Sequence, residues 1–284
     1  MIYVATVHWK SDRWLNRQQA YLQHHLPGEF RVYAWLNDLP AVPTDTFYYV
    51  NREPVTDHAT KLNRLADTIC ADSQRDDDLL IFLDGDAFPI ANLAPLLQQV
   101  LTATPLVAVQ RLENHGDRQP HPCFCVTTVG CWRKIQGDWQ AGYVWKNNDG
   151  QEVTDVGGNL LGRLTAAQIP WTPLRRTNRI NLHPLFFGIY GEVIYHHGAG
   201  FRKGDSRAEL AEFQHRARAT LWSRLFPGWT RRRLIAEYLR RMEQNHALSE
   251  QVFASIESNW EFYQQFTGVP SGAAVACLSR RRRF

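Results

Sequence analysis

The feature that most constrains this chain is an apolar run that ends in two carboxylates. Residues 79–83 read Leu-Leu-Ile-Phe-Leu and are followed by Asp84, Gly85 and Asp86. Five apolar residues bounded by charge are too few for a buried helix and are typical of a central strand in a parallel or mixed sheet. Ligands of open α/β sheets bind beyond the carboxyl ends of such strands. We therefore expect Asp84 and Asp86 to face a ligand there.

Two carboxylates separated by a glycine predict a site for a divalent cation. Gly85 lets the backbone turn at no steric cost, so both side chains can point at one ion. Oxygen ligands that leave open positions suit Mg²⁺ or Mn²⁺, whose coordination is then completed by substrate phosphates. The alternative is a plain surface turn, because Asp and Gly are common in turns everywhere. We favour the metal site because the motif directly follows the strand.

Strand and helix patterns alternate along the N-terminal part of the chain, which predicts a parallel-dominated α/β sheet. We expect strands at residues 2–7, 30–36, 47–50, 79–83, 106–109, 124–129, 169–174 and 185–195. A helical pattern follows from about residue 206 to residue 266. Pro227-Gly228 and residues 245–248 are expected to break it into three helices.

Composition and charge favour a globular protein with a basic C-terminal end. The 284 residues are 44% hydrophobic and 21% charged, which is enough for a full-size core. Residues 206–284 hold 13 Arg and 7 Glu with no Lys, so the positive charge gathers there. The ordinary meaning of such charge is a solvated helix face, and the alternative is contact with an anionic surface. We expect no nucleic-acid partner.

Cysteine usage and the N-terminal sequence favour the cytoplasm. Five cysteines, an odd number, argue against a secreted disulfide framework. Residues 1–7 carry no basic leader and run straight into a strand pattern, and no apolar run approaches the length of a membrane span. We expect a cytoplasmic protein, with peripheral contact at the inner face of the membrane through the Arg-rich end as a second possibility.

A second chemical signal lies at the end of the predicted strand 185–195. His196 and His197 are followed by glycines and then by Arg202 and Lys203. An imidazole nitrogen favours Mn²⁺ over Mg²⁺, and basic side chains suit phosphate oxygens that gain charge. Because side chains alternate along a strand, one histidine alone is expected to face the metal, and we choose His197. The alternative is two histidines without a metal, one in the core and one exposed.

These motifs together resemble GT-A glycosyltransferases, the nucleotide-sugar-dependent class whose Asp-x-Asp holds a divalent ion on the donor diphosphate. The spacing His197-x-x-Gly200-x-x-Lys203 is similar to the His-x-x-Gly-x-x-Lys motif of glycogenin-like retaining enzymes. In those enzymes the His binds the metal and the Lys binds the diphosphate. The chain departs from that motif at Gly204-Asp205, where the family has Pro-Trp.

The resemblance implies a fold and a domain plan. The fold is α/β: a GT-A, Rossmann-like, mixed and mostly parallel sheet flanked by helices, with a C-terminal helical extension. The catalytic domain is expected at residues 1–205, with its donor half at about 1–112 and its acceptor half at about 113–205. A helical extension over 206–267 and a basic tail over 268–284 follow.

The resemblance also implies a reaction. A metal-dependent transferase would move a sugar from a nucleoside-diphosphate donor, such as a UDP- or GDP-sugar, to a hydroxyl of a carbohydrate or lipid-linked acceptor. Mn²⁺ or Mg²⁺ would be held by Asp84, Asp86 and His197. Residues expected to bind the donor are Thr6, His8, Lys61, Asn63, Asp84, Gly85 and Lys203.

Asp155 is the expected catalytic carboxylate. It precedes Gly157 and Gly158 at the start of a predicted helix, and it looks like the acidic motif of the family's acceptor side. Such a group can act as general base for an acceptor hydroxyl or stabilise the anomeric centre, so the stereochemical outcome stays open. The alternative is that Asp155 caps the helix.

Two other classes of function fit parts of the sequence. A phosphate-ester hydrolase also uses aspartates at a strand end, although the Asp-x-Asp-Gly-Thr motif of haloacid-dehalogenase-type phosphatases is absent. A non-catalytic module that binds sugars or a membrane could use the aromatic and basic side chains instead. Donor turnover would separate the first class from a transferase, and nucleotide binding strengthened by Mn²⁺ would count against the second.

Overall fold

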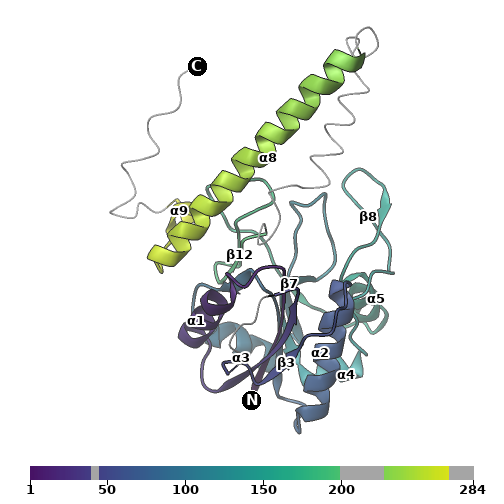
Figure 1. Ribbon diagram of the computed structural model, residues 1–284. Coiled ribbons are helices and arrows are strands. Elements are labelled where there is room, and N and C mark those ends of the chain that lie inside the picture. The colour runs from purple at the N-terminus through teal and green to yellow at the C-terminus, as the bar shows by residue number, and fades with distance from the viewer. Residues whose placement is uncertain (40–44, 199–226, 269–284) are drawn as a thin grey trace. The chain divides into compact units, whose positions relative to one another are not determined.

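The computed structural model of the chain describes residues 1–39, 45–198 and 227–268 (Figure 1). Contacts divide the chain into two compact units, which are described separately. The first consists of Met1–Gly200 together with Tyr263–Phe284, and the second of Phe201–Phe262.

The first unit is built on a seven-stranded sheet with the order β10-β6-β7-β4-β1-β2-β3. The strands are β1 Ile2–Trp9, β2 Phe30–Asn37, β3 Tyr49–Asn51, β4 Leu79–Asp84, β6 Leu106–Val109, β7 His121–Thr128 and β10 Thr172–Leu174. Strand β7 runs antiparallel to its neighbours β4 and β6, and every other pair is parallel. The predicted fold class, a mixed and mostly parallel Rossmann-like sheet, is confirmed.

Helices cover both faces of this sheet (Figure 1). They are α1 Leu15–His25, α2 His58–Asp72, α3 Ala94–Thr102, α4 Val129–Lys134 and α5 Gly158–Ala166. Alternate side chains of β4 point to opposite faces, as strand geometry requires. Leu80 and Phe82 pack with residues of α2, α4 and α5 in one cluster, and Ile81 and Leu83 pack with residues of α1 and α3 in another. The apolar run at residues 79–83 is therefore buried from both sides.

A small antiparallel sheet lies beyond the end of β4. Its strands are β5 Ala87–Pro89, β12 Ile194–His196 and β11 Gly188–Tyr190, in the order β11-β12-β5. The single strand expected at residues 185–195 is instead a hairpin that turns at Gly191 and Glu192, both with positive φ. Pro89 on β5 lies opposite Ile194. A proline is tolerated there because β5 is an edge strand.

Two further elements complete the first unit. Strand β8, Trp145–Lys146, pairs with β9, Glu152–Val153, in a two-stranded sheet. Helix α9, Gln264–Thr267, belongs to this unit and not to the predicted helical extension. The reason is Phe266, which is buried near the rings of Phe187 and Tyr195 at 6.3 and 6.1 Å.

The second unit contains helix α8, Pro227–Ser258. It begins at the predicted Pro227-Gly228 position but continues through residues 245–248, where we expected a break. That segment, Asn-His-Ala-Leu, holds neither Gly nor Pro, so nothing in it stops a helix. Within the described ranges no helix is long and apolar enough to cross a bilayer. Residues 206–226 and most of the predicted basic tail lie outside the described residues.

Replacing Phe82 with Ala should destabilise the first unit strongly. Phe82 is fully buried, with the Trp132 and Trp139 rings at 4.7 and 5.0 Å. The cavity left behind should cost about 3–5 kcal/mol of unfolding free energy, measured by urea denaturation. Leu101→Ala on α3 is the control, because Leu101 is 45% exposed and should change little. A loss below about 1 kcal/mol for Phe82→Ala would contradict this packing of the core.

Candidate metal centre at the carboxyl edge of the sheet

Chemically active side chains gather at one edge of the main sheet. Strands β1, β4 and β6 end there, and the antiparallel strand β7 begins there. This places His8, Asp84 and His121 at one edge, and Arg111 follows two residues after β6. The sequence predicts this edge as the ligand-binding edge of an open α/β sheet.

Asp84, Asp86 and His196 form a compact cluster. One ligand atom from each lies within 4.8 Å of the others. The His196 Nε2 atom is 3.7 Å from Asp84 Oδ2 and 3.4 Å from Asp86 Oδ1. The side chains of Asp84 and Asp86 are 18% and 15% exposed, so solvent reaches them. Pairing of β12 with β5 sets this arrangement, because it holds His196 opposite Ala87.

The structure differs from the prediction in which histidine joins the carboxylates. We chose His197, but its ring lies on the other side of the chain, hydrogen-bonded to Tyr195 Oη at 2.9 Å and 4.7 Å from the Trp14 ring. The His197 N–H donates to Asp86 O at 3.0 Å. That bond continues the antiparallel ladder and leaves His196 as the imidazole that faces Asp84 and Asp86.

His58, which we did not predict from the sequence, also contacts the cluster. Its Nε2 atom lies 2.9 Å from Asp84 Oδ1. Asp57 caps α2 by accepting from the Thr60 N–H at 2.7 Å, so the helix starts at His58 and presents it to the sheet edge. Burial alone would raise the pKa of Asp84, but His58 and then His196 lower it below the usual value. Asp84 is therefore ionised at neutral pH.

The charges and donor atoms of this cluster fit a divalent cation. Burial alone would raise the pKa of Asp86, but His196 lowers it. Burial would lower the pKa of His196, yet the neighbouring Cys123 and Asp86 raise it well above the ordinary value. Two carboxylates and one imidazole match the mixed oxygen and nitrogen preference of Mn²⁺, and coordination would require His196 to lose its proton.

Gln18 of α1 fixes the turn that carries the two aspartates. Its Nε2 donates to the carbonyl oxygens of Asp84 and Ala87, both at 2.8 Å. Its Oε1 accepts from Thr6 Oγ1 at 2.9 Å and from His8 Nε2 at 3.2 Å. Each donor and acceptor of the amide is used, so the turn is held rigidly against β1. Thr6 and His8, expected to contact the donor, belong to this buried network.

Gly85 is required for a different reason from the one expected. Its φ is not positive, so the turn itself does not demand glycine. A Cβ at this position would lie 2.7 Å from both His8 Nδ1 and Val7 O. The glycine therefore permits a close approach between β1 and the Asp-x-Asp turn.

The remaining predicted donor residues lie in varied surroundings. Lys61 is 1% exposed, its Nζ lies 5.1 Å from the centre of the Trp9 ring, and burial lowers its pKa. Asn63 donates to Asp138 Oδ1 at 2.7 Å and accepts from the Trp139 N–H at 2.9 Å, so it fixes that loop. Lys203 lies outside the described residues, and its role stays a prediction.

Asp155 lies in the loop between β9 and α5. It is exposed, and its Oδ1 accepts from the Val156 N–H at 2.8 Å. The residue that caps α5 is Gly157, with φ 88°, and a Cβ there would come within 2.2 Å of Pro120 O. Asp155 is therefore not the helix cap that the alternative reading requires.

Arg111 and His121 lie beside the cluster and were not singled out from the sequence. The His121 and His196 rings are 6.0 Å apart. His121 Nδ1 accepts from the Cys123 N–H at 3.1 Å, and its Nε2 lies 3.5 Å from Arg111 Nη1. The available signal was position, since Arg111 lies two residues after the predicted strand 106–109 and so belongs at the carboxyl edge.

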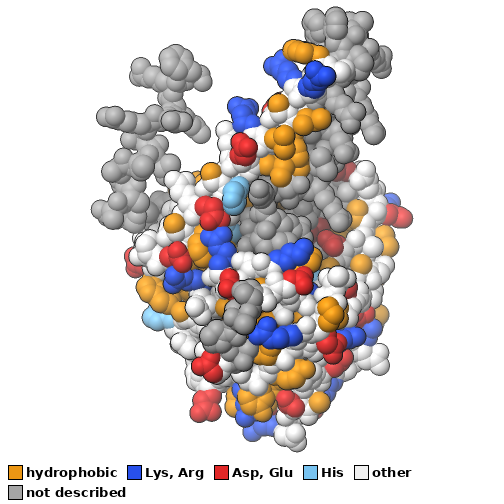
Figure 2. All heavy atoms as spheres, viewed as in Figure 1, with side chains coloured by type: hydrophobic (Ala, Val, Ile, Leu, Met, Phe, Trp, Pro, Cys, Tyr) orange, Lys and Arg blue, Asp and Glu red, His pale blue; other side chains and the backbone are white. Residues whose placement is uncertain are grey.

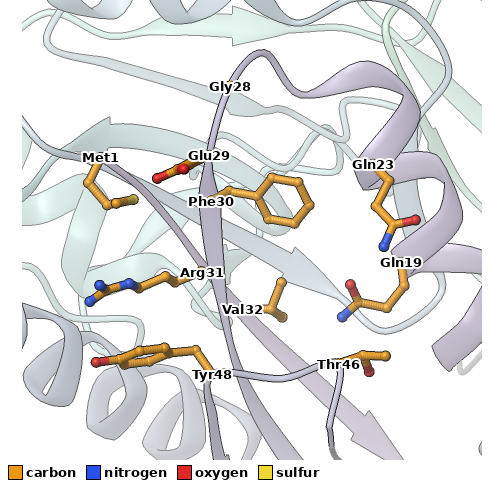
Figure 3. A pocket seen from close by; sticks show the side chains of 10 residues that line it. All are labelled: Met1, Gln19, Gln23, Gly28, Glu29, Phe30, Arg31, Val32, Thr46 and Tyr48. Carbon is orange, nitrogen blue, oxygen red and sulfur yellow. The ribbon is translucent and has the colours of Figure 1, made fainter.

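A cavity of about 460 Å³ lies at the opposite edge of the sheet (Figure 3). It opens where β1 and β2 begin, between Met1, Phe30 and Gln19. Arg31 stacks over the Tyr48 ring at 4.3 Å within its wall. The carboxylate and histidine cluster lies at the other ends of these strands, so this cavity is separate from it.

Solved structures similar to the chain include those of TarS and GlyE. No model of a protein family matches the chain, and no curated protein matches its sequence. The chain is similar to a structure of S. aureus TarS 1-349, with 10% identity over 49% of this chain and a TM-score of 0.36. It spans 50% of that TarS chain, about half its length.

A second similar structure is the apo-form glycosyltransferase GlyE of Streptococcus pneumoniae TIGR4. The identity is 14% over 82% of this chain and 64% of that chain, with a TM-score of 0.42. A further GlyE structure gives a TM-score of 0.38 at 14% identity over 61% of this chain and 44% of that chain.

The buried His8 should make the protein acid-sensitive. Burial lowers the pKa of His8 from 6.5 to about 4, against the smaller opposing effect of the Gln18 bond. Below pH 6.5 His8 binds a proton in the unfolded chain but stays neutral in the folded protein. The free energy of unfolding therefore falls as the pH is lowered from 6.5 to about 4. The loss should be on the order of 3 kcal/mol.

Urea unfolding at several pH values in this window measures the effect. His8→Gln should show a shallower loss of stability with falling pH, because glutamine does not titrate. His115→Gln, which removes an exposed histidine, should keep the slope of the natural protein. Equal slopes for His8→Gln and the natural protein would show that His8 is not held neutral.

Proposed function

We propose that the chain is a metal-dependent glycosyltransferase that moves a sugar from a nucleoside-diphosphate donor to a hydroxyl acceptor. The observation that carries the proposal is the convergence of Asp84, Asp86 and His196 at the carboxyl edge of the sheet. Such a set leaves coordination positions open for substrate phosphates. The Asp-x-Asp placed directly after a central strand, as in GT-A enzymes, supports the same reading.

Asp84, Asp86 and His196 would hold Mn²⁺ or Mg²⁺, and the ion would supply Lewis acidity that neutralises the departing diphosphate. The protein's own part is to keep the two carboxylates ionised and fixed. Burial would raise both pKa values, but His58 and His196 lower the pKa of Asp84, and His196 lowers that of Asp86. Gln18 fixes the turn by donating to the carbonyl oxygens on both sides of Gly85. Preorganised charge of this kind is the main protein contribution to reactions that release an anion.

Other residues complete the proposal. The ends of β1 and α2, including His8 and Lys61, would form the donor side, with a UDP- or GDP-sugar as the donor. Asp155 would serve the acceptor hydroxyl, of a carbohydrate or lipid-linked saccharide, or the anomeric centre. The domain plan, with a donor half before about residue 112 and an acceptor half after it, belongs to the same proposal.

A matched pair of histidine variants tests the metal assignment. His196→Ala should weaken Mn²⁺ binding by at least about tenfold, because it removes a ligand. Even the loss of a residue that only hydrogen-bonds to a metal ligand lowers metal affinity by about that factor. His197→Ala should leave Mn²⁺ affinity near that of the natural protein, since its ring faces Tyr195 and Trp14. It should instead lower the melting temperature. Electron paramagnetic resonance of free Mn²⁺ measures the affinity. If His197→Ala lost Mn²⁺ affinity and His196→Ala kept it, His196 would not be the metal ligand.

Nucleotide binding and turnover test the reaction class. A thermal-shift screen of nucleoside diphosphates should show stabilisation by one of them that requires Mn²⁺. Slow hydrolysis of the matching nucleotide sugar to a nucleoside diphosphate would support a transferase. Release of inorganic phosphate from phosphate esters would support a hydrolase instead.

A cytoplasmic location and peripheral membrane contact extend the proposal. The cysteines that the structure describes are free thiols, as expected in a reducing compartment. On the first half of α8, hydrophobic and basic side chains lie close together (Figure 2). Trp229, Ile235 and Leu239 are exposed, as are Arg232 and Arg233. Apolar and basic groups on one helix suit the surface of an anionic bilayer.

Co-sedimentation with vesicles tests that contact. The protein should bind phosphatidylserine vesicles more strongly than phosphatidylcholine vesicles at low salt. Reversing two charges in Arg232→Glu/Arg233→Glu should weaken binding by about tenfold or more, at about 1 kcal/mol per basic residue. Lys134→Glu, at the end of α4 in the first unit, is the control. Equal binding by the double variant would remove α8 from the proposal.

A further inference from the structure

The neighbours of the two ring nitrogens of His121 cannot both be satisfied by hydrogen bonds from a neutral imidazole. Nδ1 accepts from the Cys123 backbone N–H at 3.1 Å, so it carries no proton. The single proton of a neutral imidazole must then be on Nε2. Nε2 lies 3.5 Å from Arg111 Nη1, which can only donate. Two N–H donors therefore face each other, and no hydrogen bond joins them.

Arg111 has few partners, among the described residues, for a largely buried guanidinium. Its side chain is 15% exposed, and its Nε makes no hydrogen bond within that part of the chain. Nη2 makes a long bond of 3.4 Å to Leu185 O. The nearest carboxylate of the described ranges, Glu113, is 4.0 Å from Nε and already accepts from Tyr190 Oη at 2.6 Å. The described residues therefore leave most of the donor capacity of Arg111 unused.

An acceptor oxygen placed between Arg111 and His121 would satisfy both side chains. A separation of 3.5 Å is less than twice an ordinary N···O distance of about 2.9 Å, so one oxygen can bond to both nitrogens. His121 is partly exposed, so a ligand can reach it. An anionic oxygen suits the pair best, because the guanidinium is always charged and its bonds to anions are strong.

We propose that Arg111 and His121 form a subsite for a phosphoryl oxygen of the donor diphosphate. The subsite lies beside the metal cluster, since the His121 and His196 rings are 6.0 Å apart. This inference rests on the proposed function for its choice of ligand. The charge of Arg111 offsets the repulsion that Asp84 and Asp86 exert on a diphosphate, which the metal alone would otherwise have to overcome.

Calorimetry with inorganic pyrophosphate and saturating Mn²⁺ tests the subsite without a known donor. Arg111→Met should weaken pyrophosphate binding by about 10- to 100-fold, the value of charge-assisted hydrogen bonds to an anion. His121→Phe should weaken it several-fold, because one neutral donor is lost. Arg118→Met removes an exposed arginine from the same connection and should bind like the natural protein. Mn²⁺ affinity should be unchanged in all three variants.

The outcomes separate this inference from the function on which it rests. Unchanged pyrophosphate affinity in Arg111→Met, with intact Mn²⁺ binding, would overturn the subsite and leave the metal site standing. Failure of the natural protein to bind pyrophosphate with Mn²⁺ would instead overturn the proposed function. If Arg111→Met lost affinity for orthophosphate but not for pyrophosphate, the oxygen would belong to another phosphate, and the donor assignment would fall. Arg111→Lys, which keeps the charge but not the fork, should give an intermediate affinity and serves if Arg111→Met does not fold.

The protonation of His121 provides an independent test. Nuclear magnetic resonance of ¹⁵N-labelled histidine should show His121 with its proton on Nε2 at neutral pH. Pyrophosphate added with Mg²⁺ should shift that Nε2 signal in the natural protein and in Arg118→Met. A proton on Nδ1 would remove the conflict between the two donors and with it the basis of the inference.

Discussion

The candidate site depends on the pairing of two three-residue strands. Strand β5 follows the Asp-x-Asp turn directly, and β12 comes more than a hundred residues later. Their antiparallel register holds His196 opposite Ala87 and brings the His197 N–H to Asp86 O. Because side chains alternate along a strand, a slip of one residue would exchange the two imidazoles. Short strands thus decide which nitrogen meets the carboxylates.

A second constraint acts from beneath the turn. Gln18 binds both carbonyls that flank it, and the other end of its amide is held by Thr6 and His8. Gly85 allows β1 to approach so closely that no side chain fits between them. Buried hydrogen bonds within the protein therefore hold the metal cluster in place before any ligand binds. Rigid support of this kind reduces the reorganisation needed when charge develops.

Local sequence was enough to predict β4, the position of Asp84 and Asp86, and the layered α/β fold, because each rests on neighbouring residues. Long-range contacts were not predictable in the same way. Gln18, His58 and His121 reach the site from three separate elements, and no local pattern marks them. The prediction of His197 in place of His196 was wrong. Alternation along a strand shows only that the two side chains point to opposite faces. Pairing with β5, which is distant in sequence, determines which of them faces the carboxylates.

The chain passes through the second unit between two segments that both belong to the first. Residue 200 closes one segment, and Tyr263 opens the next, which contains α9. Phe266 on α9 packs beside Phe187, which directly precedes β11, and beside Tyr195 on β12, the strand that carries His196. A fragment cut after residue 200 would consequently expose those two rings to water. Shortened versions of the protein need the α9 segment restored, by a linker that replaces the second unit.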